Sequence, residues 1–221
     1  MIYNRWGKYL HSSIKLVPVE FAGRGTRFRE PFYESFEEAI EDIYFHIEDR
    51  LMEGSFSFLG HSMGSVLVYE IIHKHKKLKK EDPAHVFFSG RYPPHIHRES
   101  NILSLPDEEF LKRISWYGGT PKEVFENVEL RRIVLPILRA DYKIMESYEF
   151  ENPGIKMGCD ITILNGKHDE TVQRGDLNEW HGYTDGRCDI HEFEGGHFFI
   201  NDYDKEITDI INNKIAKYIG L

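Results

Sequence analysis

The residues with the clearest chemical potential are the five at positions 60–64, whose sequence is GHSMG. They fit the pattern G-x-S-x-G, in which flanking glycines let a serine occupy a strained turn with its hydroxyl group exposed. Serine is a poor nucleophile at neutral pH and requires an adjacent base. We therefore predict that Ser62 attacks a carbonyl carbon in acyl transfer, and that the backbone N–H of Met63 faces the oxyanion that forms.

The base and its orienting carboxylate are expected downstream, in the order serine, aspartate, histidine. Asp169 follows an apolar run at residues 160–164, and His197 lies in the glycine-flanked sequence EGGHFF at residues 194–199. Because the carboxyl ends of parallel strands share one edge of a sheet, a group just past such a strand lies on the same rim as Ser62. We predict that His197 is the general base and that Asp169 orients it.

Two other histidines lie near these positions in the sequence. His168 adjoins Asp169, but a residue directly beside the orienting carboxylate could hardly bridge it to Ser62. His61 lies inside the pentapeptide and is expected to point away from the position of the base, in packing or a local hydrogen bond. His197 is therefore favoured, because it follows the last predicted strand.

Asp141 is the main rival of Asp169 as the orienting carboxylate. It lies in a stretch with helical periodicity, where we expect it to pair with Arg139 or to cap the backbone locally. Asp176 and Asp189 are less favoured, because neither closes a predicted strand.

The elements that must position these groups are predicted from the spacing of apolar residues. Short apolar or β-branched runs predict strands at 14–20, 56–59, 84–89, 160–164 and 187–193, although Pro18 weakens the first. Apolar residues at spacings of three and four predict a helix over residues 36–51, and a second helix follows the pentapeptide. Strands that alternate with helices indicate an α/β fold with a mostly parallel sheet covered on both faces.

The segment at residues 95–158 has helical periodicity but no predicted strand. We interpret it as a helical insertion, which at the carboxyl end of a sheet commonly roofs a binding site. The length of 221 residues suits one sizeable core, so a single domain over residues 1–221 is expected.

Composition excludes several classes of function. The net charge of −9, without a basic stripe, argues against nucleic-acid binding. No stretch approaches the length needed to span a bilayer, and the start lacks the apolar core of a signal peptide, so a cytoplasmic protein that does not bind membranes is expected. Cys159 and Cys188 each adjoin a predicted strand, which favours buried thiols over a disulfide framework.

Several motifs together resemble those of the type II thioesterases that accompany nonribosomal peptide and polyketide synthases. Beside the pentapeptide, the matching segments are 18–25 (PVEFAGRG), 88–91 (FSGR) with 94–95 (PH), 118–121 (GGTP), 136–141 (PILRAD) and 195–198 (GGHF). Their combination is far more specific than the pentapeptide alone, which many lipases and esterases share.

The resemblance implies an α/β-hydrolase fold in which the helical insertion at 95–158 forms a lid. It implies hydrolysis of acyl, aminoacyl or peptidyl thioesters on the phosphopantetheine arm of an acyl or peptidyl carrier protein, which clears misprimed synthases in antibiotic biosynthesis. Ser62, Asp169 and His197 match the family's catalytic triad. The resemblance implies no cofactor and no metal, and we expect a monomer.

The family normally opens with an apolar strand and a loop of the Pro-Tyr-Ala-Gly-Gly type, whose backbone supplies a second oxyanion donor. Residues 2–10 of this chain resemble the helix just after that loop. We therefore expect the coding frame to begin upstream of Met1 and the missing strand to lie between those at 14–20 and 56–59. Two alternatives stay open: a free-ester or acyl-CoA hydrolase with the same triad, and a catalytically impaired remnant that binds carrier proteins.

Overall fold

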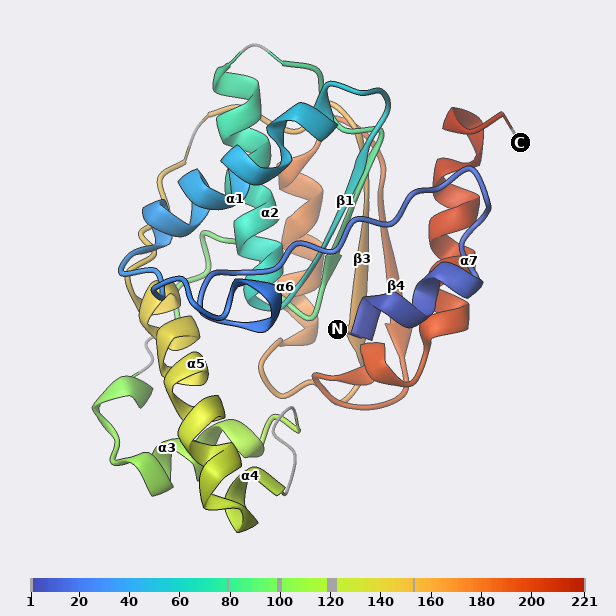
Figure 1. Ribbon diagram of the computed structural model, residues 1–221. Helices are drawn as coiled ribbons and strands as arrows, with labels where there is room; N and C mark the ends of the chain where they lie inside the picture. Colours follow the sequence, from blue (N-terminus) through green and yellow to red (C-terminus); the bar gives the residue numbers. More distant parts are fainter. Residues whose placement is uncertain (1, 79, 99–100, 119–122, 153, 221) are drawn as a thin grey trace. The chain divides into compact units, whose positions relative to one another are not determined.

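The computed structural model describes residues 2–78, 80–98, 101–118, 123–152 and 154–220 (Figure 1). They fall into two compact units. The first comprises Met1–Val19, Asp49–Pro93 and Pro153–Leu221, and the second comprises Glu20–Glu48 and Pro94–Asn152. The single domain expected over residues 1–221 stays a prediction. Residues 119–121 of the family motif lie outside the described residues.

A parallel four-stranded sheet forms the centre of the first unit, in the order β1-β2-β3-β4. The strands are β1 Ser57–His61, β2 His85–Ser89, β3 Asp160–Gly166 and β4 Cys188–Phe193. All of β2 and nearly all of β3 are buried. Strands buried on both faces consist of nearly continuous apolar runs, as β2 does. Four of the five predicted strands are confirmed to within two residues at each end.

The predicted strand at residues 14–20 is wrong. This segment is extended but pairs with no strand among the described residues, and β1 forms the edge of the described sheet. A strand exists only where a neighbour accepts and donates its backbone hydrogen bonds, and Pro18 has no N–H to contribute. Leu16, Val17 and Val19 are accordingly 36%, 40% and 39% exposed.

Helices cover both faces of this sheet, as predicted: Figure 1 shows α2 (Met63–Lys77) on one face and α7 (Asp204–Ile215) on the other. Ile207, Ile211 and Ile215 of α7 join a buried cluster with Phe87 and Leu164 of the sheet. Burying such a side chain contributes roughly 1.5–3 kcal/mol relative to leaving it exposed. The first unit also contains the short helix α6 (Arg174–Asn178).

The second unit is helical. It contains the start of α1 (Phe36–Leu51), α3 (Asp107–Ser115), α4 (Glu123–Glu126) and α5 (Val128–Glu146). The helix predicted over residues 36–51 is therefore confirmed. The Asn127 side chain caps α5 by accepting hydrogen bonds from the N–H groups of Glu129 and Leu130, at 2.9 and 3.1 Å. The described part of the predicted insertion at 95–158 contains helices and no strand of the sheet; its role as a lid stays a prediction.

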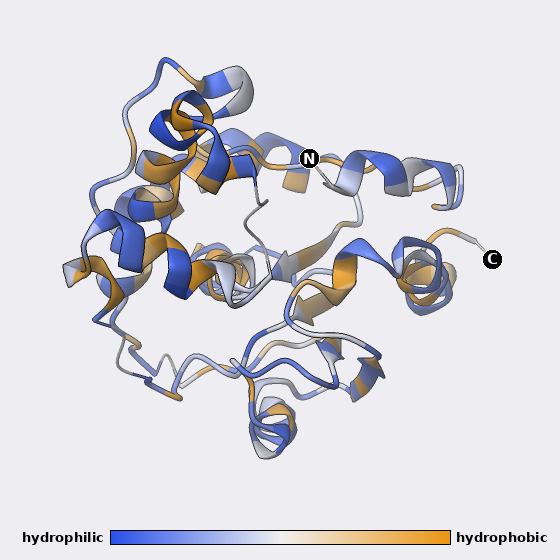
Figure 2. Ribbon diagram, turned by 90° about the horizontal axis from the view of Figure 1, so that it is seen from below, coloured by the Kyte–Doolittle hydropathy of each residue, from blue (hydrophilic) through white to orange (hydrophobic). Residues whose placement is uncertain are grey.

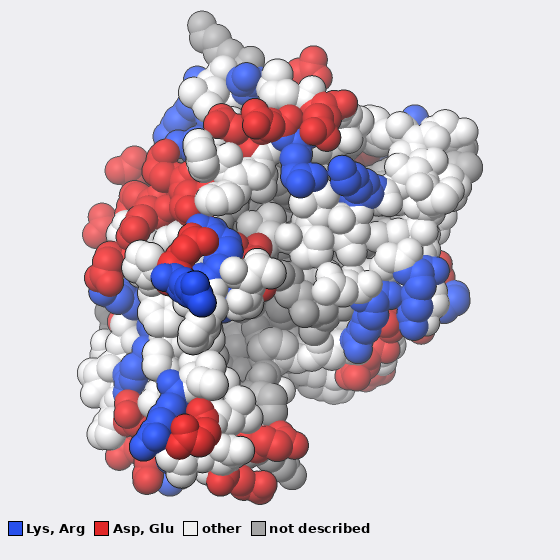
Figure 3. Space-filling view, viewed as in Figure 1, with Lys and Arg blue, Asp and Glu red and all other residues white. Residues whose placement is uncertain are grey.

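Short 3₁₀ helices connect these elements. They are η1 Ile2–Lys8, η2 Gly25–Arg27, η3 Ile102–Ser104, η4 Glu179–Tyr183, η5 Phe199–Asn201 and η6 Ala216–Tyr218. In Figure 2 apolar and polar residues alternate along the same helices, as amphipathic packing requires. None of the described helices has the length and apolar character that a bilayer crossing demands. On the face seen in Figure 3, acidic side chains gather at the upper left, while basic side chains lie in small separate groups.

Candidate active site

The pentapeptide at 60–64 forms a sharp turn between β1 and α2. Ser62 has φ 55° and ψ −117°, and it is the one non-glycine residue with positive φ in the described part of the chain. Such a conformation costs of order 1–3 kcal/mol and persists only where the surroundings hold it. Here the N–H of Ser62 donates to the carbonyl of Ser89 at 2.7 Å, and the Ser65 hydroxyl donates to the carbonyl of Gly60 at 2.8 Å.

The two glycines of the turn differ in what they allow. A Cβ atom at Gly60 would lie 2.2 Å from the carbonyl oxygen of Gly64, whereas a Cβ atom at Gly64 would meet nothing within 4 Å. The close approach of strand and helix backbones therefore requires glycine at position 60. Space alone does not require it at position 64.

The structure brings Ser62, His197 and Asp169 together. Nε2 of His197 lies 2.9 Å from Oγ of Ser62, and Nδ1 lies 2.7 Å from Oδ2 of Asp169. Asp169 follows β3 and His197 follows β4, so both stand on the rim where β1 ends. With the Nδ1–H donating to the carboxylate, Nε2 is free to accept the serine proton, which is the tautomer that general-base catalysis requires.

The charge state of Asp169 suits this arrangement. The residue is only 4% exposed. Burial by itself would raise the pKa of Asp169, but hydrogen bonds from His197 and Thr171 and the attraction of His197 hold that pKa below its usual value. The carboxylate is therefore ionised at neutral pH, which is the state that the predicted role of orienting a histidine base requires.

The sequence matches the family described as the thioesterase domain over residues 1–217. The chain belongs to this family. It is 33% identical to linear gramicidin dehydrogenase LgrE of Brevibacillus parabrevis over 99% of this chain and 84% of that protein. It is 32% identical to thioesterase PikA5 of Streptomyces venezuelae over 96% of this chain and 75% of that protein.

The fold of this thioesterase is also that of a solved relative. A crystal structure of ClbQ from the colibactin NRPS/PKS pathway has a TM-score of 0.92 and 32% identity, covering 98% of this chain and 91% of that chain. The predicted class, an α/β-hydrolase with a parallel sheet, is confirmed. The family makes the chain an enzyme that acts on thioester bonds.

Thr171 is a fourth member of the site that the sequence reasoning missed. Its hydroxyl group donates to Oδ1 of Asp169 at 2.6 Å, and its N–H donates to the same oxygen at 2.9 Å. One carboxylate oxygen of Asp169 is thus held by Thr171, while the other faces His197. A threonine two residues after an aspartate is the pattern of an Asx turn, and this signal could have identified it.

The rival histidine is placed elsewhere in the thioesterase. The His168 side chain is 71% exposed and approaches Glu194 at 3.3 Å. His61 was expected to point away from the base and to make a local hydrogen bond, and both expectations are wrong: its Nδ1 is hydrogen-bonded at 2.9 Å to the hydroxyl group of Ser89, 28 residues further along the chain. Its ring also packs against the ring of His197, which was not predicted.

The rival carboxylates have other partners too. Asp141 belongs to the second unit and accepts two hydrogen bonds from Arg24, at 2.8 and 2.6 Å. The predicted pair of Asp141 with Arg139 is wrong, because Arg139 donates instead to Asp107 at 2.6 Å. The remaining two, Asp176 and Asp189, respectively cap the start of α6 and pair with Lys214.

Met63 is the first residue of α2. The N–H groups in the first turn of a helix have no acceptor within the helix, so they are available to an anion. This position suits the predicted oxyanion donor, which stays a prediction. The second oxyanion donor, which was expected in a loop before Met1, also stays a prediction.

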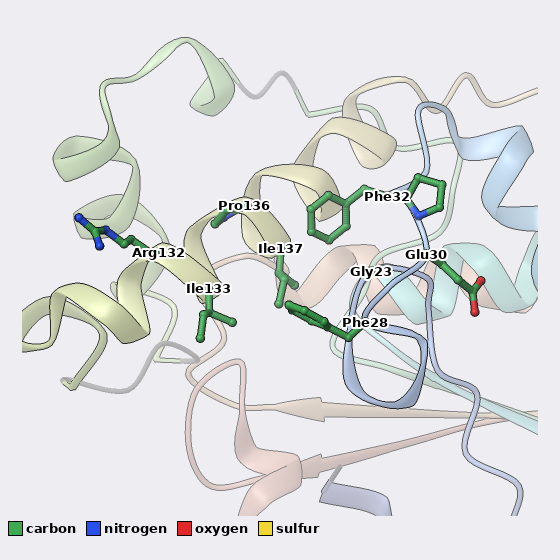
Figure 4. A pocket seen from close by; sticks show the side chains of 9 residues that line it. Gly23, Phe28, Glu30, Phe32, Arg132, Ile133, Pro136 and Ile137 are labelled. Carbon is green, nitrogen blue, oxygen red and sulfur yellow. The ribbon is translucent and has the colours of Figure 1, made fainter.

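The second unit contains an apolar hollow of about 320 Å³. Figure 4 shows Phe28 and Phe32 from the 20–33 segment and Ile133 and Ile137 from α5 around it, with charged side chains at Glu30 and Arg132. The apolar lining suits a hydrocarbon chain better than a charged ligand. Within the described residues, no group of three or more His, Cys, Asp or Glu side chains could hold a metal ion.

Proposed function

We propose that this thioesterase hydrolyses acyl, aminoacyl and peptidyl thioesters on the phosphopantetheine arm of a carrier protein, and so edits misprimed synthases. The observation that carries the proposal is the continuous chain of contacts from Ser62 through His197 to Asp169 in a member of the thioesterase family. PikA5 is named a thioesterase, and ClbQ belongs to an NRPS/PKS pathway. The name of LgrE describes a dehydrogenase, but the family match covers nearly the whole chain and we follow it.

In the proposed mechanism Oγ of Ser62 attacks the thioester carbonyl carbon while Nε2 of His197 takes the serine proton. The N–H of Met63 stabilises the oxyanion of the tetrahedral intermediate, and Asp169 stabilises the imidazolium. The C–S bond then breaks, and His197 returns its proton to the departing thiolate. Water then gives a proton to Nε2 of His197 and attacks the carbonyl carbon of the acyl-enzyme. The bond to Oγ of Ser62 breaks, His197 returns the proton to Oγ, and the acid is released.

The apolar hollow of the second unit is by itself a candidate site for an acyl chain. The hollow is lined largely by apolar side chains, among them Phe28, Phe32 and Ile137. An acyl chain would bury its methylene groups there, each contributing about 0.8 kcal/mol. We include a monomeric state and a cytoplasmic location in the proposal, to be checked by light scattering and by fractionation of the producing cells.

The experiment that tests the function compares three substrates with the same acyl group. They are the acyl-phosphopantetheinyl carrier protein, the acyl-CoA and a 4-nitrophenyl ester. We expect the highest kcat/KM with the carrier protein and no hydrolysis by the variant Ser62→Ala. A preference for the ester or for acyl-CoA would overturn the assignment to carrier proteins, while carrier binding without any hydrolysis by the wild type would indicate a silent binding module.

A further inference from the structure

His61 makes contacts that connect it to the base of the proposed mechanism. The ring centroids of His61 and His197 are 5.1 Å apart, with 39° between the ring planes. His61 is also anchored through Nδ1 to the hydroxyl group of Ser89 at 2.9 Å. His61 and Ser89 are also register partners at the ends of β1 and β2, so the sheet itself fixes their separation.

The space for this pair of rings depends on Gly90. That residue has φ +59°, and a Cβ atom there would lie 2.7 Å from Cε1 of His61 and 3.4 Å from Cε1 of His197. The backbone thus passes directly against both imidazoles. Because their surroundings are close-packed, a change in the position of one ring is transmitted to the other.

The chemistry of the His61 imidazole suits a support and not a proton carrier. Its Nε2 atom is shielded from solvent and has no hydrogen-bond partner among the described residues. Burial, and to a smaller extent the neighbouring His197, lower the pKa of His61 to about 3. His61 therefore stays neutral and adds no charge beside the imidazolium that forms on His197.

We propose that His61 is a positioning residue. Its ring is held by Ser89, packs against the ring of His197, and so keeps Nε2 of His197 directed at Ser62. The inference rests on the proposed function, in which His197 is the base. Displacing a catalytic group by about 1 Å costs on the order of 100-fold in rate. His61 does not take part in any proton transfer.

The test uses His61→Ala, which removes the ring that packs against His197, and His61→Phe, which keeps an aromatic ring but has no titrating group. Ser89→Ala removes only the anchor. The matched control is His85→Ala. His85 is also a buried histidine of the sheet with one hydrogen bond, from Nε2 to the Thr162 hydroxyl at 2.8 Å, but it lies at the opposite end of β2.

Each variant is assayed by steady-state hydrolysis of 4-nitrophenyl acetate, by the rate at which a fluorophosphonate labels Ser62, and by thermal denaturation. For His61→Ala we expect kcat and the labelling rate to fall by about 100-fold with KM unchanged, because only the base is displaced. We expect His61→Phe to recover most of that loss and Ser89→Ala to lose less than His61→Ala. His85→Ala should lower the melting temperature but leave kcat unchanged.

Three results would overturn the inference: wild-type kcat in His61→Ala, no recovery in His61→Phe, or an equal loss of kcat in the His85 control. If His61→Ala fails to fold, His61→Phe and Ser89→Ala are compared with the wild type to test the inference. Equal kcat in the wild type and Ser89→Ala would then show that the hydrogen bond from Ser89 does not position His61. A wild-type enzyme whose Ser62 is not labelled would overturn the proposed function as well. If Ser62 of the wild type is labelled but His61→Ala keeps the wild-type kcat, this inference alone is overturned.

Discussion

The two glycines that flank the serine turn predict opposite effects of the same substitution. In Gly60→Ala the new methyl group would lie 2.2 Å from the carbonyl oxygen and 2.4 Å from the carbonyl carbon of Gly64. Normal carbon contacts are about 3.5–4.0 Å, and the opposing atoms are backbone, so the strand and helix must move apart. Overpacking typically costs 1–3 kcal/mol, and we expect about 3 kcal/mol here because no side chain can yield.

The matched variant is Gly64→Ala. Gly64 lies in the first turn of α2 with open space around its Cα. Replacing a helical glycine by alanine stabilises by roughly 0.5–1 kcal/mol. For a chain of this size 1 kcal/mol corresponds to about 2–4 °C in melting temperature. Gly60→Ala should therefore melt about 6–12 °C lower than the wild type, and Gly64→Ala about 1–4 °C higher.

Differential scanning calorimetry measures both shifts, and fluorophosphonate labelling of Ser62 reports on the turn itself. Because the methyl group of Gly60→Ala displaces the backbone next to Ser62, we expect its labelling rate to fall by on the order of 100-fold. A Gly60→Ala enzyme with wild-type melting temperature and labelling would refute the reasoning. So would a pair of variants that are equally destabilised.

Three further predictions concern the site and the buried histidines. Asp169→Asn should lower kcat by on the order of 10⁴ in ester hydrolysis, because the amide favours the wrong tautomer of His197; a loss below tenfold would contradict the assigned role. Thr171→Val removes one hydrogen bond to Asp169 and should lower kcat by roughly tenfold, whereas Thr171→Ser should retain activity, and equal rates in both variants would contradict it. Burial lowers the pKa of His73 and His85 to about 4 from the ordinary 6.5, so the unfolded chain binds more protons between these values and stability falls as the pH drops below about 6.5. Each histidine then lowers the free energy of unfolding by up to about 2 kcal/mol at pH 5. Urea midpoints that do not change between pH 7.5 and pH 5 would exclude the effect.

Local patterns were sufficient to predict that Ser62, Asp169 and His197 lie together. The pentapeptide around Ser62 and the groups that follow two later strands are fixed by short-range signals, since a parallel sheet brings the ends of its strands to one rim. β2 and β3, the two central strands, are buried almost throughout and contain short apolar runs, which makes them visible in the sequence.

Distant partners that no motif marks could not be predicted. Asp141 and Arg24 are 117 residues apart, and nothing near Asp141 distinguishes that arginine from Arg139 two positions away. The ring contact between His61 and His197 likewise depends on where β1 and β4 end in space. The error at residues 14–20 has the same origin, because residue type predicts an extended backbone but not a neighbouring strand.

The ion pair of Arg24 and Asp141 has a consequence for the hollow in the second unit. Phe28 and Phe32, which line one side of the hollow, follow Arg24 along the chain. Ile137, which lines the other side, lies one turn before Asp141 on α5. The ion pair of Arg24 and Asp141 therefore links the two sides of the hollow. Their spacing is set before any ligand arrives, and a bound chain need not order them. If the hollow binds the acyl group as proposed, replacing Arg24 or Asp141 changes the preferred acyl length without altering any side chain that lines the hollow.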